Sequence, residues 1–237
     1  FAGNEATGTN YLIQMETDNH QTAPTAIPVL TFENNTFDFD EFSKSILYLK
    51  IVMNRGKSTI HNCSFSKGRN YGENPNANCI SANLISEIKI SECIFHETGK
   101  DDNDETNDGG YVIGIGIYPN NNPDPNDERI ECYIENCIFN FTSAAVSCYT
   151  EEITFTGNIL YKCGRSAFRV SRRKQSEHGF ILENNTFSES NTGIMINSWD
   201  VGLKHQPSIK NNTFDDIFAP GGNSESDQSE YGFRFTI

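Results

Sequence analysis

Apolar residues alternate with single polar ones along this chain, and the alternation recurs as one short motif. The motif is clearest in FILENNTF, residues 180–187. Six further copies keep its key positions in register: TFENNTF (31–37), TIHNCSF (59–65), KISECIF (89–95), YIENCIF (133–139), TFTGNIL (154–160) and SIKNNTF (208–214). Alternation with a period of two is typical of a strand, so each copy is predicted to be a strand, a turn and a second strand.

Three positions keep their residue type in every copy. The central position, which we call the anchor, holds only Asn or Cys, in the order Asn35, Cys63, Cys93, Cys137, Asn158, Asn185 and Asn212. Three residues before the anchor stand Phe32, Ile60, Ile90, Ile134, Phe155, Leu182 and Ile209, and two residues after it stand Phe37, Phe65, Phe95, Phe139, Leu160, Phe187 and Phe214. Both apolar columns are predicted to face the core. The anchors are predicted to form an internal ladder at a turn, where Asn tolerates a left-handed backbone.

The spacing of the anchors predicts how the copies are arranged. Asn185 follows Asn158 by 27 residues and precedes Asn212 by the same number. Periods of roughly 20 to 50 residues are typical of repeat arrays, in which each unit buries its apolar side against its neighbours. The sequence therefore predicts a stacked parallel β-solenoid that forms one domain over residues 1–237. Further strands are expected at 11–15, at 45–51, near Ile80 and at 111–118.

The I-x-x-N-x-F cadence resembles the parallel β-helix repeat of the pectate-lyase-like superfamily. That resemblance implies an all-β fold, a single-stranded right-handed parallel β-helix of about seven to eight coils with an inward Asn ladder at one corner. The shorter pattern N-C-x-F, at residues 62–65, also resembles repeats in surface β-helix families such as the polymorphic membrane proteins. The tetrapeptide G-G-A-I of those families is missing, and GGYV at 109–112 comes nearest to it.

The charge and hydropathy of the chain exclude some partners. The net charge is −14 and the isoelectric point is near 4.7, which argues against binding nucleic acid or an anionic membrane through the bulk surface. No apolar run reaches the roughly 18 residues that a membrane-spanning helix needs. Of the seven cysteines, Cys132 and Cys148 are expected to face inward like the anchor cysteines. No two of the seven cysteines form a CxxC pair with the spacing of a zinc site. We therefore interpret the cysteines as small apolar side chains that fill the core.

The segment 99–129 is a loop-rich acidic insertion, because the copy that contains it is much longer than the others. It carries hard oxygen donors at Asp101, Asp102, Asp104 and Asp108. These carboxylates are candidates for a calcium ion, although Thr106 stands where an EF-hand loop needs Gly. A solvated acidic loop is the simpler alternative, and no other cofactor is expected.

Cationic residues gather in the later copies of this acidic chain. If Phe168 and Val170 face inward, Arg169 faces outward, and Arg234 lies two coils further along the same face. The predicted ligand-binding residues on this basic face are Arg169, Arg172, Trp199, Lys204, His205 and Arg234. Solvated arginines that keep an exposed sheet soluble are the alternative.

Two classes of function fit this pattern. The resemblance implies that a polysaccharide lyase or glycoside hydrolase acting on an acidic glycan is possible, with Arg169, Lys204 and His205 as the candidate catalytic residues. However, the polygalacturonase signatures NTD, GHG and RIK are absent, and Trp199-Asp200 does not reproduce the W-x-D-H of pectate lyases. The favoured class is an extracellular or cell-surface solenoid, namely an adhesin, a glycan-binding protein or a structural stalk, whose partners are carbohydrate or neighbouring solenoid segments.

Sequons and the two ends of the chain add two expectations. The glycosylation candidates are Asn34, Asn62, Asn140, Asn184 and Asn211, which indicate a secreted or cell-surface protein unless the asparagines only serve the turns. Phe1 has the place of a final motif Phe, and residues 231–237 look like the second strand of a coil. The chain is therefore expected to be an excerpt of a longer solenoid.

Overall fold

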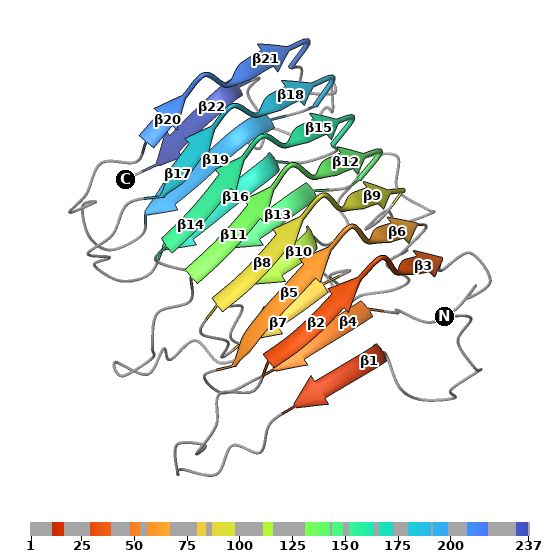
Figure 1. Cartoon of the computed structure of the whole chain (residues 1–237). Coiled ribbons are helices and arrows are strands. Elements are labelled where there is room, and N and C mark those ends of the chain that lie inside the picture. Colours follow the sequence, from red (N-terminus) through yellow and green to blue (C-terminus); the bar gives the residue numbers. More distant parts are fainter. Residues whose placement is uncertain are drawn as a thin grey trace.

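The chain builds three parallel sheets from strands that lie far apart in the sequence (Figure 1). The structure, a computed structural model, describes residues 11–16, 29–38, 48–52, 56–66, 80–83, 87–97, 111–115, 131–142, 144–148, 152–163, 166–172, 180–190, 192–198, 208–217 and 231–236. Within these ranges every element is a strand and none is a helix. The expected all-β class is confirmed.

Each sheet gathers strands from successive copies of the motif. Sheet 1 contains β1 (Tyr11–Glu16), β4 (Tyr48–Val52), β7 (Ile80–Asn83), β10 (Tyr111–Ile115), β13 (Ala144–Cys148), β16 (Ser166–Arg172), β19 (Thr192–Ser198) and β22 (Tyr231–Thr236). Sheet 2 contains β2 (Val29–Glu33), β5 (Lys57–His61), β8 (Glu87–Ser91), β11 (Glu131–Glu135), β14 (Glu152–Thr156), β17 (Ile181–Glu183) and β20 (Ser208–Lys210). Sheet 3 contains β3 (Thr36–Asp38), β6 (Ser64–Ser66), β9 (Ile94–His96), β12 (Ile138–Asn140), β15 (Ile159–Tyr161), β18 (Thr186–Ser188) and β21 (Thr213–Asp215).

The order of the strands is the one expected for a solenoid. Along the chain a strand of sheet 2 is followed by one of sheet 3 and then by one of sheet 1, and the next coil repeats the sequence. Neighbours within each sheet pair in parallel (Figure 1). The strands expected outside the motif copies are present as β1, β4, β7 and β10, and residues 45–47 and 116–118 of the expected ranges lie outside the described residues. β10 shows that the 99–129 insertion contains a strand, while its four candidate calcium ligands lie outside the described residues.

The two apolar columns of the motif form the core. Pairing aligns the first column from Phe32 to Ile209 and the second from Phe37 to Phe214. Most of their side chains are fully buried, but Phe32 and Ile209 are half-buried and Phe214 is 40% exposed. These three exceptions lie on the first and last strands of sheets 2 and 3, where a side chain has a neighbouring strand on one side only.

Stacked aromatic rings fill the core behind sheet 3. Phe37, Phe65, Phe95 and Phe139 form one stack with centroid separations of 4.7, 4.9 and 4.9 Å. These separations match the spacing of hydrogen-bonded strands, so each coil adds one ring to the stack. Leu160 interrupts the stack, and Phe187 and Phe214 resume it at 5.1 Å.

The turn between sheets 2 and 3 corrects one expectation. The residue with the left-handed backbone is the one before the anchor, as at Asn34 (φ 57°), Asn62 (φ 48°) and Asn184 (φ 59°), and not the anchor itself. Glu92 and Gly157 take the same position in their coils. The left-handed residue turns its amide toward the next coil, so that Asn62 N donates to Ser91 O at 3.0 Å. The anchor side chain is thereby free to point inward.

Candidate functional site

The anchor column forms a hydrogen-bonded ladder inside the molecule. Asn158 Nδ2 donates to Asn185 Oδ1 at 3.1 Å, and Asn185 Nδ2 donates to Asn212 Oδ1 at 2.9 Å. The same two oxygens accept the backbone N–H groups of Asn158 and Asn185 at 2.9 and 3.0 Å. Asn158 and Asn185 are buried, and Asn212 in the last coil is half-buried. The ladder binds each coil to the next and presents nothing to a ligand.

Every anchor after Asn35 also donates a side-chain hydrogen bond to a backbone carbonyl oxygen of the preceding coil. Asn158, Asn185 and Asn212 reach the carbonyl oxygens of Ile134, Phe155 and Leu182 at 3.0, 2.9 and 2.8 Å. The cysteine anchors repeat this pattern with longer bonds from sulfur. Cys63, Cys93 and Cys137 reach the carbonyl oxygens of Phe32, Ile60 and Ile90 at 3.7, 3.6 and 3.7 Å. Asn35, in the first motif copy, bonds instead to Glu33 O at 2.9 Å.

The thiols are structural rather than reactive. Among the described residues the cysteines Cys63, Cys93, Cys132, Cys137 and Cys163 are buried and form no disulfide. Burial raises the pKa of the Cys163 thiol to about 11 and that of Cys137 well above its usual value. A nucleophilic cysteine needs the thiolate near neutral pH, so Cys137 and Cys163 are unsuited to catalysis. A hydrogen bond with Cys137 lowers the pKa of the Cys93 thiol, but that thiol is fully buried. Cys148 lies in β13, and its side chain is outside the described set.

A second internal ladder, which the sequence analysis missed, occupies the corner after sheet 3. Thr142 Oγ1 lies 3.2 Å from Cys163 Sγ, and the Cys163 N–H donates to Ser190 Oγ at 3.1 Å. All three residues are buried. The sequence signal for this ladder is a small residue three positions after the motif Phe or Leu, namely Thr142, Cys163 and Ser190. The column changes residue type in every coil, so the pattern is hard to recognise.

The structure aligns the backbone of the predicted basic face. Pairing places Arg169 beside Ser147 and Met195, and Met195 beside Arg234, so the two arginines share one position two strands apart in sheet 1. Arg172 pairs with Ser198 in the same sheet. The arginine side chains are not described, and Trp199, Lys204 and His205 lie outside the described residues. Whether these residues form one surface stays a prediction.

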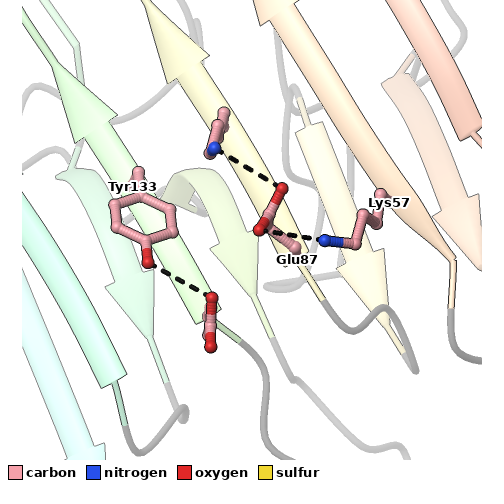
Figure 2. Close-up of polar contacts among 5 residues, drawn as sticks. Lys57, Glu87 and Tyr133 are labelled. Carbon is pink, nitrogen blue, oxygen red and sulfur yellow. Dashed lines mark hydrogen bonds and ion pairs between the residues drawn. The ribbon is translucent and has the colours of Figure 1, made fainter.

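The outer face of sheet 2 carries a polar cluster that the sequence did not reveal (Figure 2). Pairing puts Lys89 beside Tyr133 in one row, and Lys57, Glu87 and Glu131 in the neighbouring row. We call these five residues the sheet 2 cluster. All of them are at least partly exposed. They come from three adjacent strands, β5, β8 and β11, which fix the separation of the side chains.

Charges and an aromatic ring interlock within the sheet 2 cluster. Glu87 holds Lys57 Nζ at 3.3 Å through one carboxylate oxygen and Lys89 Nζ at 3.6 Å through the other (Figure 2). Lys89 Nζ also lies 5.3 Å from the centroid of the Tyr133 ring, within the range of a cation–π interaction. The Tyr133 hydroxyl donates to Glu131 Oε2 at 3.2 Å. The ring is therefore held between an ammonium group and a carboxylate on a sheet face.

This arrangement suits recognition better than proton transfer. Two lysines and two glutamates balance each other, so the sheet 2 cluster offers hydrogen-bond donors and acceptors without a net charge. Tyr133 adds an aromatic side chain with a polar tip, which is typical of binding surfaces. Ion pairs on an exposed sheet contribute little to folding stability, so their presence is not explained by stability alone.

The sequon asparagines differ in exposure. Asn34, Asn62, Asn184 and Asn211 all lie at the exposed left-handed turn position. The Asn62 amide donates to Asn34 Oδ1 at 2.6 Å, so these two form an external amide pair. Asn140 differs because it lies in β12 with its Oδ1 atom buried and unpaired. Four of the five sequon asparagines are thus exposed, and Asn140 is half-buried.

The comparisons with known proteins return no relative: the chain matches no family model, no curated protein and no solved structure. Within the described ranges no group of three or more His, Cys, Asp or Glu side chains is placed to hold a metal ion. The described residues also include no helix long and apolar enough to cross a membrane.

Proposed function

We propose that this chain is a secreted or cell-surface right-handed parallel β-helix that binds glycans, as an adhesin or as a binding segment of a stalk. The right hand is supported by the general preference of parallel strand crossovers for that hand. The extracellular setting is supported by the four exposed sequon asparagines. Such a solenoid supplies long, stiff faces on which ligands can bind across several coils.

The sheet 2 cluster is the observation that carries the proposal. A sugar ring offers apolar C–H faces and a rim of hydroxyl groups. The Tyr133 ring is an aromatic surface on which the C–H face of a sugar can pack. The Lys89 ammonium group can donate hydrogen bonds to sugar hydroxyl groups, and the carboxylates of Glu87 and Glu131 can accept them. Because regular strands hold all these groups, little side-chain freedom is lost on binding, which favours affinity.

The charge balance of the sheet 2 cluster defines the preferred glycan. Both lysines contact the Glu87 carboxylate, and Glu131 brings the number of carboxylates in the cluster to two, so the cluster has no excess of cations for a uronate or sulfate. We therefore expect a neutral glycan. A ligand that contacts only an exposed sheet surface is expected to bind weakly, with a dissociation constant of about 0.1 to 1 mM.

A glycan array of neutral and acidic oligosaccharides tests this function. The wild-type chain should retain neutral members, and Tyr133→Ala should reduce their retention at least tenfold. Thr31→Ala is a matched control, because Thr31 shares the register row of Tyr133 three strands away. Equal retention by the wild type and Tyr133→Ala would contradict the assignment to sheet 2.

The second candidate is a lyase or hydrolase that acts on an acidic glycan through the basic face. The shared register of Arg169 and Arg234 favours it, because two cations two strands apart could neutralise neighbouring uronates. The test incubates the chain with acidic polysaccharides and follows chain length and the absorbance of unsaturated products. Cleavage that disappears in Arg169→Glu would favour this candidate over simple binding.

A further inference from the structure

A row of exposed isoleucines crosses the outer face of sheet 3. Ile94, Ile138 and Ile159 occupy paired positions on β9, β12 and β15 and are 45%, 38% and 47% exposed. At the same position the other strands carry hydroxyl side chains: Thr36, Ser64, Thr186 and Thr213. The apolar row is thus confined to three adjacent strands. Grouped exposed apolar side chains of this kind are typical of interaction sites.

Aromatic side chains extend this row toward the next turn. The Phe141 ring lies edge-on to His96 and to Tyr161, with centroid separations of 6.0 and 5.5 Å. Phe141 has a φ of 54°, a left-handed conformation that is sterically unfavourable for an aromatic residue. The same turn position is left-handed in the neighbouring coils, at Glu97 (φ 50°) and Lys162 (φ 52°), so the repeat of the fold imposes this backbone and holds the Phe141 ring at the edge of the row. We call Ile94, Ile138, Ile159, His96, Phe141 and Tyr161 the sheet 3 patch.

Opposite charges flank the sheet 3 patch symmetrically. The turn position that holds Phe141 after β12 holds Glu97 after β9 and Lys162 after β15. A negative and a positive charge therefore lie one coil to either side of the central ring. Glu97 Oε1 lies 3.8 Å from His96 Nε2. Lys162 Nζ lies 3.2 Å from Glu189 Oε2. The same ammonium group lies 5.2 and 5.0 Å from the ring centroids of Phe141 and Tyr161.

We propose that the sheet 3 patch binds a second copy of this chain, through a two-fold axis that runs along β12. Such an axis reverses the order of the coils but keeps the direction of the strands. It places β9 of one copy over β15 of the other, and β12 over β12. Two sheets packed face to face in this way lie about 10 Å apart with interleaved side chains.

The surface is self-complementary under this operation. Ile94 faces the second copy's Ile159, and the two Ile138 side chains meet at the axis together with the two Phe141 rings. Glu97 faces the second copy's Lys162 on both sides of the axis. This residue-by-residue reciprocity is what an isologous dimer interface requires, and no other row of sheet 3 offers it in the described part of the chain.

The dimer is expected to be weak and reversible. Only three short strands contribute, so the interface lies below the area of a typical stable complex. Sedimentation velocity from about 1 µM to about 300 µM brackets the affinities of such small interfaces. The wild-type chain should change from monomer to dimer over this range. A wild-type chain that stays monomeric throughout, or that buries this face only against a different protein, would overturn the proposal.

Matched isoleucine variants localise the interface. Ile138→Lys should weaken dimerisation at least tenfold, whereas Ile181→Lys should leave it unchanged, since Ile181 is equally exposed (40%) but lies on sheet 2. Ile138→Thr introduces a residue that the same row tolerates elsewhere, so it keeps the test valid if the lysine variant fails to fold. An equal loss in the Ile181 variant, or an unaffected Ile138→Thr variant, would contradict the patch.

Charge exchange tests the two-fold geometry itself. Glu97→Lys and Lys162→Glu should each weaken the dimer several-fold, because each creates two like-charged contacts across the axis. The double variant restores opposite charges and should regain at least half of the lost free energy of association. Two single-variant losses that simply add in the double variant would show that Glu97 and Lys162 do not meet across an interface.

Discussion

The side-chain amide of an anchor asparagine makes several hydrogen bonds at once. In Asn185 the Nδ2 group donates to Phe155 O and to Asn212 Oδ1, while Oδ1 accepts from the backbone and side chain of Asn158. A buried amide with all these partners satisfies backbone groups that the turn would otherwise leave without a hydrogen bond. A thiol can donate but accepts poorly, so the cysteine coils have fewer such bonds between them.

Replacing the anchor amide should therefore destabilise the fold. Asn185→Leu leaves the carbonyl of Phe155 and the N–H of Asn158 without these partners, and we expect a loss of about 1–3 kcal/mol in the free energy of unfolding. Asn212→Leu should cost less because that residue is half-buried. Chemical denaturation measures both. Asn184→Gly is the control, since Gly adopts the left-handed backbone of Asn184 freely. Equal stability of Asn185→Leu and the wild type would contradict the ladder.

The buried thiols predict a slow reaction with alkylating agents. Because the pKa of Cys163 is raised to about 11, its thiol is neutral at pH 8, and burial also blocks access. Labelling at pH 8 should leave Cys163 and Cys137 unmodified in the folded chain and modify both in denaturant. Mass spectrometry of peptides distinguishes the sites. Rapid labelling of Cys163 in a chain that remains folded would contradict its placement.

At the level of elements, the left-handed turn residue sets the direction of sheet 3 relative to sheet 2. Most coils have Asn at this position, but one coil has Gly157, which adopts the left-handed backbone easily because it has no Cβ. Its φ is 67°, and an added Cβ would lie 2.4 Å from Asn136 Oδ1. The Asn136 side chain fills the space that Gly157 leaves open, so the two turns interlock.

This interlocking predicts the effect of one methyl group. Gly157→Ala should destabilise the chain by about 1–3 kcal/mol, partly through the left-handed backbone and partly through the clash with Asn136. Asn136→Gly removes the obstructing amide but not the backbone strain. The double variant should therefore recover part of the loss, which thermal or chemical unfolding can measure. A neutral Gly157→Ala variant would show that the turn differs from the described geometry.

The elements themselves were largely accessible from sequence, because period-two alternation and a fixed break are both local signals. The columns that begin at Phe32 and Phe37 appear as paired strands, and the turn falls where the break was expected. The left-handed residue was placed one position too late because Asn34 and Asn35 are both asparagines. Glu92 and Phe141 take a left-handed backbone against their preference, which local sequence does not predict.

The surface sites were far less accessible. The contact between Lys89 and Tyr133 joins residues 44 positions apart, across the acidic insertion, and outward positions have no common residue type. Only the register of the strands brings such residues together. The exposed isoleucines could not be recognised from sequence because an isoleucine is usually a core residue. Ile138 in YIENCIF therefore resembles one more buried side chain, although it is 38% exposed.

At the level of the whole molecule, the three parallel sheets give the chain faces of different chemistry. Sheet 2 carries the interlocked charges around Tyr133, sheet 3 carries the isoleucine and aromatic patch, and sheet 1 aligns the backbones of Arg169 and Arg234. Each coil contacts mainly its neighbours, so one face can change without disturbing the others. The proposed glycan binding and the proposed association of two copies use different sheets, so the two proposals are compatible with each other.

Calorimetric titration with a neutral oligosaccharide, at low and at high salt, tests the proposed function most directly. A charge-balanced aromatic cluster predicts an affinity that changes less than about twofold between about 50 and 500 mM salt. It also predicts that Tyr133→Ala abolishes binding while Arg169→Glu with Arg234→Glu preserves it. Binding that weakens steeply with salt, survives in Tyr133→Ala and disappears in the double arginine variant would contradict the account and place the ligand on sheet 1.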